Sequence, residues 1–360
     1  MKKILNNLAA VVSLALLCVS CDKVGGDVPL VQSTGNVLVL NNGNWGGNDA
    51  CLTSYNLKTG DVAGGAFMAT NGQALGDLAQ DILVDSGNIY VAVYGSQLIF
   101  VIDKDLKLKK TVIAENDGMK LSPRAMVKGG DKLYVTYYEG YLGEIDPDNG
   151  YEVRIVKVGS NPDGLAYADG KVYVANSGGM NYPDYDNTVS VVDATSFAVT
   201  STIQVNVNPA KVFASGNHVF VSSFGNYADA PAKLQCIDAR TGSVADTPYS
   251  NVSSIALGTE GRLYVLCGGY DEMWNPLPGT VYVHNASENT PSSASALVPF
   301  VTDATVFPNA YSLSATQDGY VYVGCSDYVS TGDVYVMTFE GTLHAKFDSQ
   351  GLNPIAVAAL

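Results

Sequence analysis

The stretch from Gly87 to Asp103, GNIYVAVYGSQLIFVID, consists of two apolar runs joined by a few polar residues. Such a pair of runs predicts two neighbouring strands of an antiparallel sheet. Similar pairs occur elsewhere, so the chain holds seven related units. Successive units start between about 39 and about 58 residues apart, a period typical of propellers and other repeat arrays. The six other units begin at Val37, Leu133, Val172, Val219, Leu263 and Val321.

Each unit has the same internal order. An apolar run such as DILV, from Asp81, precedes a tight turn and a second run of the LYV type, whose consecutive apolar residues are typical of a strand covered on both faces. A loop leads to a third run that ends in Asp or Asn, whose side chain bonds the backbone of a turn. A weaker fourth run follows. Seven units of four antiparallel strands predict an all-β fold, a seven-bladed β-propeller. Third runs end at Asp103, Asp146, Asp193 and Asp238.

The two ends of the chain predict how the ring closes. The first unit has no leading strand, because the segment from Lys23 to Thr34 is not apolar. The last residues, NPIAVAAL from Asn353, form a leading strand with nothing after it. We therefore expect the C-terminal strand to complete the first blade, which removes the open edges of an incomplete ring.

The N-terminus has the pattern of a signal peptide. MKK precedes an apolar segment from Leu8 to Val19, too short to span a bilayer, and a Ser-Cys pair typical of lipoprotein cleavage. Cys18 stands where such a site usually has Leu, so ordinary cleavage is the alternative. We expect residues 1–20 to be removed, Cys21 to carry a lipid, residues 21–34 to form a tether and residues 35–360 to form one propeller.

Composition excludes two classes of partner. The chain has 20 Lys and Arg against 35 Asp and Glu, a formal charge of -15 at pH 7. Nucleic acids and anionic membrane surfaces both require basic patches, so neither is an expected partner. Contact with the membrane is expected only through the lipid anchor.

The cysteines and histidines predict no metal site. Four cysteines fall in or beside apolar strands without a C-x-x-C motif, so buried free thiols are expected, with disulfides as the open alternative in an exported protein. The three histidines stand singly, which favours structural roles over metal binding. These residues are Cys51, Cys236, Cys267, Cys325, His218, His284 and His344.

Catalytic signals are weak. The sequence has no G-x-S-x-G and no Gly-rich phosphate loop. DPDNG at Asp146 resembles a calcium loop, but its Pro and the missing later ligands favour a plain turn. No catalytic residue, metal or cofactor is expected, and a binding protein is favoured over an enzyme. Because lyases and quinoproteins also use propellers, a propeller lyase is the lower alternative.

The loops between second and third strands point to a ligand site. All seven emerge on one face of a propeller, and here they contain no Lys or Arg, both Trp of the chain and many Tyr, Asn, Gly and Asp. Such a rim suits a large neutral or cationic ligand with flat faces and many hydrogen-bonding groups. For any one aromatic the alternative is packing against its blade. The candidates are Asn44, Trp45, Tyr94, Tyr138, Tyr141, Asn176, Tyr182, Tyr185, Phe224, Tyr227, Tyr270, Trp274 and Tyr328.

Three further candidates stand at the start of first strands on the same side. Gln80, Arg124 and Asp163 are candidates for lining the mouth of the central channel, but solvated turn residues are the favoured interpretation. Among the aromatics, Trp274 lies in GGYDEMWNPLPG, where flanking Gly and Pro predict a stiff, projecting loop.

Two stretches resemble a known family. NPDGLAYADGKVYVANSGG from Asn161, followed by TVSVVDATSFAVTSTIQV, resembles the repeat of YncE-like propellers. NGQALGDLAQDILVDSGNIYVAVYGSQLIFVID from Asn71, with VLNNGNWGGNDACLTSYN from Val39, is similar to YncE-like surface lipoproteins of Bacteroidetes. The resemblance covers essentially the whole chain after Cys21.

The resemblance implies a lipid anchor in the outer membrane and exposure on the cell surface. The best-understood members of the group are surface propellers that capture cobalamin and sit on an outer-membrane vitamin transporter. Capture of a corrinoid for such a transporter is therefore the leading expectation, although none of the quoted motifs carries over a ligand residue. The alternatives are glycan binding and a protein-interaction scaffold.

Overall fold

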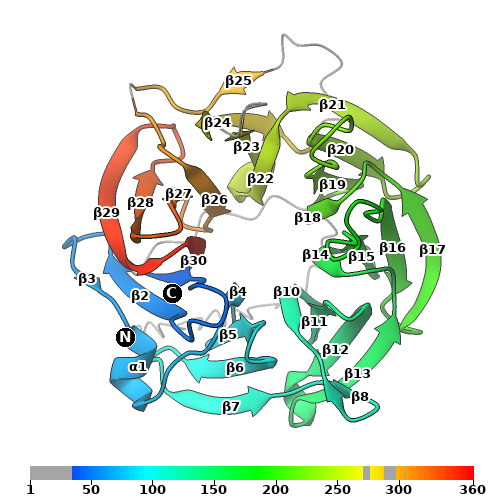
Figure 1. The fold of residues 1–360 in the computed structure, drawn as a ribbon, viewed down its shortest axis with the longest axis horizontal. Coiled ribbons are helices and arrows are strands. Elements are labelled where there is room, and N and C mark those ends of the chain that lie inside the picture. The colour runs from blue at the N-terminus through cyan, green and yellow to red at the C-terminus, as the bar shows by residue number, and fades with distance from the viewer. Residues whose placement is uncertain (1–34, 271–275, 288–296, 304) are drawn as a thin grey trace, which may run out of the picture.

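The structure, a computed structural model, describes residues 35–270, 276–287, 297–303 and 305–360. It is almost entirely β, and seven four-stranded antiparallel sheets form blades around a central axis (Figure 1). The predicted seven-bladed β-propeller is therefore confirmed. In every blade the first strand lies next to the axis and the fourth lies on the outside of the ring (Figure 1).

We number the blades along the chain and give their strands from the axis outward. Blade 1 holds β30 (Pro354–Ala359), β1 (Asn36–Asn41), β2 (Cys51–Asn56) and β3 (Val62–Ala63). Blade 2 holds β4 (Ala79–Asp85), β5 (Asn88–Val93), β6 (Leu98–Asp103) and β7 (Leu108–Val112). Blade 3 holds β10 (Pro123–Gly129), β11 (Lys132–Tyr137), β12 (Tyr141–Asp146) and β13 (Glu152–Lys157). Blade 4 holds β14 (Pro162–Ala168), β15 (Lys171–Asn176), β16 (Thr188–Asp193) and β17 (Ala198–Gln204).

The other three blades follow the same order. Blade 5 holds β18 (Pro209–Ser215), β19 (His218–Ser223), β20 (Lys233–Asp238) and β21 (Val244–Ser250). Blade 6 holds β22 (Val252–Leu257), β23 (Arg262–Tyr270), β24 (Pro276–Asn285) and β25 (Val298–Pro299), and blade 7 holds β26 (Ala310–Ala315), β27 (Val321–Cys325), β28 (Thr331–Met337) and β29 (Leu343–Leu352). Outside the blades lie the short helix α1 (Ala66–Asn71) and the hairpin of β8 (Glu115–Asn116) and β9 (Met119–Lys120).

The core lies between neighbouring blades. The second strands are buried along nearly their whole length, as their consecutive apolar residues predicted. Between blades 3 and 4, for example, Tyr134 and Leu142 pack against Leu165, Val172 and Val174. Each blade thus relies on both neighbours to cover its apolar faces, and the hydrophobic stabilisation depends on a complete ring.

The C-terminal strand closes that ring. β30 pairs antiparallel with β1, with Val37 opposite Ala359 and Leu40 opposite Ala356. Towards blade 7, the Ser312 hydroxyl donates to the carbonyl of Pro354 over 2.6 Å. The expectation that the last residues complete the first blade is confirmed, so no inner edge of blade 1 is left open.

The aspartates that end third strands organise turns, as the sequence predicts. Each carboxylate accepts from a backbone N–H a few residues further on, which fixes the reversal into the fourth strand. The N···O distances are 2.9 Å from Asp105 to Asp103, 3.1 Å from Asp148 to Asp146, 2.7 Å from Ser196 to Asp193 and 2.8 Å from Arg240 to Asp238.

The cysteines and histidines lie within the blades. Cys236 and Cys325 are buried, whereas Cys51 and Cys267 are only half-buried, and all four are free thiols. His218 and His284 are buried with their rings edge-on to Phe220. The ring of His344 lies 5.1 Å from that of Tyr320. His218 and His284 are therefore packing residues, as expected, whereas His344 is exposed beside Tyr320.

The expected signal peptide, the tether and Cys21 lie outside the described residues. Among the residues that the structure describes, no helix is long and apolar enough to cross a bilayer.

Candidate functional site

The inner strands of blades 2, 3 and 4 begin irregularly at one end of the ring, at the place expected for the mouth of the central channel. In blades 2, 3 and 4 the register shifts after the first residue of the inner strand, so Gln80, Arg124 and Asp163 have no partner in the ladder. A bulge of this kind re-aims a side chain out of the regular alternation. The three residues come from different blades, but they occupy the same place in each repeat.

Arg124 joins these three blades. Its Nη1 donates to Oε1 of Gln80 over 3.0 Å, and its Nη2 donates to Oδ2 of Asp163 over 2.8 Å. Burial alone would lower the pKa of Arg124, but the Asp163 carboxylate more than offsets it, and the pKa lies above its usual value. The favoured interpretation as solvated turn residues is therefore corrected: the Arg124 and Asp163 side chains are only 21% and 18% exposed, and the three residues form a connected polar group on the inner strands.

Glycine makes this arrangement possible on the side of blade 4. Gly164 follows Asp163, and a Cβ there would lie 2.2 Å from the carbonyl oxygen of Ala210 in blade 5. No larger residue fits without moving the two inner strands apart. The close approach of blades 4 and 5 thus fixes the backbone that carries Asp163.

Two tyrosines lie over the guanidinium group. The carbon at its centre is 4.8 Å from the ring centre of Tyr138 and 5.5 Å from that of Tyr94. Burial raises the pKa of both phenols, so both remain protonated at neutral pH and can donate hydrogen bonds. An arginine already paired with a carboxylate and covered by aromatic rings offers a flat, polarisable surface rather than a free positive charge.

Trp45 extends this surface to the rim. Its ring centre lies 6.0 Å from that of Tyr94, which lies 5.6 Å from that of Tyr138. The Trp45 side chain is 74% exposed. Its loop is held from both sides, because Asn44 N donates to Asp49 and Gly46 N donates to Asp77. The row Trp45, Tyr94 and Tyr138 is called the aromatic row below.

A second aromatic group stands on the loops of blades 4 and 5. The ring centres of Tyr182 and Tyr185 are 6.0 Å apart, and those of Tyr185 and Tyr227 are 6.1 Å apart. Tyr182, Tyr227 and the neighbouring Phe224 are exposed. These residues form a rim surface but do not contact Arg124 in the described contacts.

The acidic residues of the rim loops hold the loops in shape. Glu139 accepts from Ser122 N over 2.9 Å, Asp186 accepts from Ser160 N over 3.2 Å, and Asp327 accepts from Ser330 N over 2.7 Å. A carboxylate that caps backbone N–H groups in this way is already partly satisfied. These three carboxylates therefore make the rim negative while they hold the loop backbones in place.

Asn176 does not belong to the rim surface. It is buried, its Oδ1 accepts from Gly159 N over 3.0 Å, and its Nδ2 lies 2.9 Å from the hydroxyls of both Thr188 and Ser190. Asn41, at the same place in blade 1, is buried in the same way and donates to Thr53. The expectation of a ligand contact at Asn176 is corrected to a structural role, because its polar atoms are used inside the blade.

Two other candidates lie apart from the aromatic row. The Tyr141 hydroxyl accepts from Asn116 Nδ2 over 3.0 Å, and Lys157 lies over its ring, so Tyr141 is held beside the β8–β9 hairpin. Tyr328 lies on blade 7, with its ring centre 5.5 Å from that of Tyr311. Trp274 lies outside the described residues, and for Tyr270 only the backbone is described, as the last residue of β23.

Sequence reasoning missed two residues near the axis. Tyr311 has the same place in β26 as Arg124 has in β10, after a register shift, and burial raises its pKa to about 12. Asp81 directly follows Gln80 and accepts from Met126 N over 2.7 Å. Burial raises the pKa of Asp81 to about 6, while Lys211 on the inner strand of blade 5 lowers it. The sequence offered a signal for both residues. Tyr311 is the second residue of an inner strand, as Arg124 is, and Asp81 is next to the candidate Gln80.

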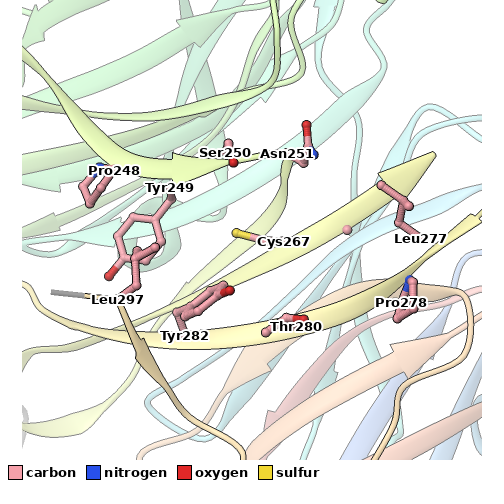
Figure 2. Close-up of a pocket in the computed structure, with 11 residues that line it drawn as sticks. Pro248, Tyr249, Ser250, Asn251, Cys267, Leu277, Pro278, Thr280, Tyr282 and Leu297 are labelled. Carbon is pink, nitrogen blue, oxygen red and sulfur yellow. The ribbon is translucent and has the colours of Figure 1, made fainter. Parts of the chain in front are cut away.

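A separate cavity of about 220 Å³ lies between blades 5 and 6 (Figure 2). Tyr249, Tyr282, Cys267 and Pro278 line it, which explains why Cys267 is only half-buried. The volume is below the range of roughly 300 to 1,000 Å³ that is usual for ligand pockets. Burial raises the pKa of Cys267 to about 12, so its thiol is a poor nucleophile at neutral pH.

The groups around the channel mouth are of kinds that bind small ligands. The mouth combines a paired guanidinium, protonated phenols, a side-chain amide and an exposed indole within one connected group. In the described ranges, no three His, Cys, Asp or Glu side chains lie close enough together to hold a metal ion. The arrangement suits a ligand with a broad flat face and hydrogen-bonding groups at its edge.

Comparisons with known proteins support the fold alone. No family model and no curated protein sequence matches the chain. Among solved structures, hydrazine synthase from Kuenenia stuttgartiensis is 16% identical with a TM-score of 0.61, over 76% of this chain and 86% of that chain. The Pan2 WD40 domain of Neurospora crassa is 11% identical with a TM-score of 0.57, over 83% and 86%. Apo AztD from Citrobacter koseri is 12% identical with a TM-score of 0.52, over 89% and 83%. These similarities agree with a β-propeller and identify no family.

Proposed function

We propose that the protein is a ligand-binding propeller whose site is the mouth of the channel beneath the aromatic row. The observation that carries the proposal is Arg124, which links Gln80 and Asp163 and lies under Tyr94 and Tyr138. Bringing a guanidinium, a carboxylate and an amide together from three blades costs desolvation. The hydrogen bonds of Arg124 to Gln80 and Asp163 offset part of this desolvation cost. They also hold Arg124 in place under Tyr94 and Tyr138, so that the surface next to the exposed Trp45 is ordered before a ligand binds.

The ligand class follows from shape and charge. The Arg124 charge is paired with Asp163, and the acidic rim loops carry no Lys or Arg, so a strongly anionic ligand is disfavoured. A flat face covering Trp45 would contribute about 1 to 3 kcal/mol. A corrinoid has flat faces and a periphery of amides, and it is the first ligand to test. The resemblance to cobalamin-capturing propellers supports the same choice.

The cellular setting is part of the proposal. The N-terminal pattern and the resemblance support a lipoprotein, anchored through Cys21 in the outer membrane and exposed on the cell surface. A capture protein there would pass its ligand to an outer-membrane transporter. The anchor would supply the only contact with the membrane.

Isothermal titration of the full chain with cobinamide and cobalamin tests the proposal. Wild-type protein is expected to bind at least one of them, and Tyr138→Ala or Arg124→Gln should weaken binding at least about tenfold, since central aromatic and Arg residues dominate binding energy. Arg154→Gln is the matched control. Arg154 also pairs with a carboxylate, Glu144, and lies 4.5 Å from a ring centre, that of Phe197, but on the outer strand of blade 3.

The outcomes separate the site from its ligand. If corrinoids do not bind but a neutral oligosaccharide does, and the same two variants lose that binding, the site stands and the ligand is a glycan. If Arg124→Gln binds every ligand as well as Arg154→Gln does, the proposed site is wrong.

A further inference from the structure

Three tyrosines on the rim loops of blades 4 and 5 expose aromatic surface to solvent. Tyr182 is 74% exposed and Tyr227 is 58% exposed, and the Tyr185 ring centre lies 6.0 Å and 6.1 Å from theirs. The plane of the Tyr185 ring is inclined by 71° to that of Tyr182 and by 68° to that of Tyr227. Rings at such steep angles meet through an edge, so they do not cover one another's faces by stacking. These three residues are called the tyrosine cluster below.

The loops that carry the tyrosine cluster are held in place by hydrogen bonds. In the loop of blade 4, Met180 N donates to Oδ1 of Asn161 over 3.2 Å. In the loop of blade 5, Ala230 N donates to Oδ1 of Asn226 over 2.9 Å. The aromatic side chains are therefore presented by ordered backbone. Neighbouring aromatic side chains that stay exposed on ordered loops are typical of a binding surface.

The charge around the tyrosine cluster favours a cation. The loops 177–187 and 224–232 contain Asp184, Asp186 and Asp229 and no Lys or Arg. The carboxylates of Asp186 and Asp229 accept from Asn187 N and Asn226 Nδ2, each over 2.7 Å. These carboxylates attract a cation through the field of the loops, but part of their hydrogen-bonding capacity is already used. The aromatic rings are therefore the main contact surface.

Elsewhere the chain covers aromatic rings with its own cations. Among the described residues, an Arg or Lys side chain lies over six rings, those of Tyr94, Tyr138, Tyr141, Phe197, Tyr335 and Phe339. No Lys or Arg in the same part of the chain lies over a ring of the tyrosine cluster. The face of an aromatic ring attracts a cation that comes within about 6 Å of its centre. The faces of the tyrosine cluster are thus left for a cation from outside the chain.

We propose that the tyrosine cluster binds a small organic cation, a quaternary ammonium compound. Rings at steep angles to one another can contact a rounded trimethylammonium group from different sides. Such a group has no N–H donor, so it does not need the carboxylate oxygens that Asp186 and Asp229 use within their own loops. The proposal stands whether or not a corrinoid binds at the channel mouth.

Isothermal titration of the full chain with choline tests this proposal, and saturable binding is expected. The matched ligand is the neutral alcohol in which carbon replaces the choline nitrogen, since it has the same shape without the charge. It should bind at least about tenfold more weakly, because the attraction of a ring face for a cation is electrostatic.

Variants of the chain locate the site. Tyr185→Ala should weaken choline binding at least about tenfold, because the Tyr185 ring lies next to both others. Tyr185→Phe should keep the binding, because the face of the ring remains. Tyr328→Ala removes an exposed tyrosine from the rim loop of blade 7, and it is the matched control. If circular dichroism shows that Tyr185→Ala does not fold, Tyr227→Ala on the other loop replaces it.

Four outcomes would overturn the proposal. Choline might fail to bind, or the neutral alcohol could bind as tightly as choline does. Tyr328→Ala could lose as much binding as Tyr185→Ala, which would place the cation elsewhere on the rim. Tyr185→Phe could lose as much as Tyr185→Ala, which would show that the hydroxyl and not the ring face makes the contact.

Discussion

Deletion of residues 355–360 is expected to lower the free energy of unfolding by about 5 kcal/mol or more, which is the whole stability of a marginal domain. The deletion removes most of β30 and uncovers the inner edge of β1 from Val37 to Leu40. Ile355, Ala356 and Ala358 also leave the core that blades 1 and 2 share. Circular dichroism during chemical denaturation measures the loss.

Removal of Leu360 alone is the matched control for that deletion. Leu360 lies beyond the end of β30, where its N–H donates to the carbonyl of Asn36 and its side chain packs against the same core, so its removal should cost only a small part of that free energy. A chain without residues 355–360 that unfolds at the same denaturant concentration as the Leu360 deletion would show that closure by β30 is not needed.

Asp81→Asn is expected to stabilise the protein at neutral pH. Burial raises the pKa of Asp81 to about 6, although Lys211 and the N–H of Met126 act against this. A carboxyl group with a raised pKa in the folded state favours folding fully below its unfolded pKa, and that contribution is lost as pH rises through the folded pKa. The neutral amide avoids the loss, so the variant gains at most about 3 kcal/mol above pH 7 and nothing near pH 4.

The measurement is the difference in unfolding free energy between wild type and Asp81→Asn across this pH range. Asp238→Asn is a control of opposite sign, because the Arg240 side chain lowers the pKa of Asp238 to about 2. That variant should be less stable than wild type above about pH 4, and this deficit should disappear as pH falls towards 2. A constant difference for Asp81→Asn at every pH would mean that the amide only disturbs packing.

Most of the fold could be predicted because its signals are local. Consecutive apolar residues in second strands and aspartates at the ends of third strands each act within a few residues. The closing strand β30 could also be predicted, because NPIAVAAL is apolar and no later strand in the chain follows it as a partner. Nothing in these signals depends on knowing the neighbouring blade.

The site could be predicted only in part because it depends on neighbouring blades. Arg124 bonds residues 44 and 39 positions away, and only the repeat register brings them together. Asn176 resembles a loop residue in sequence, but its partner Gly159 arrives from the connection before its blade. Tyr311 was missed because its strand, AYSLSA, has a weak apolar pattern.

The most direct test of the central claim is hydroxyl-radical footprinting of the full chain with and without bound cobinamide. The account predicts protection of Trp45, Tyr94 and Tyr138 and no change at Met119, which is exposed on the β8–β9 hairpin away from the channel. Protection of Met119 or of the outer strands, with Trp45 unchanged, would contradict a ligand site at the channel mouth.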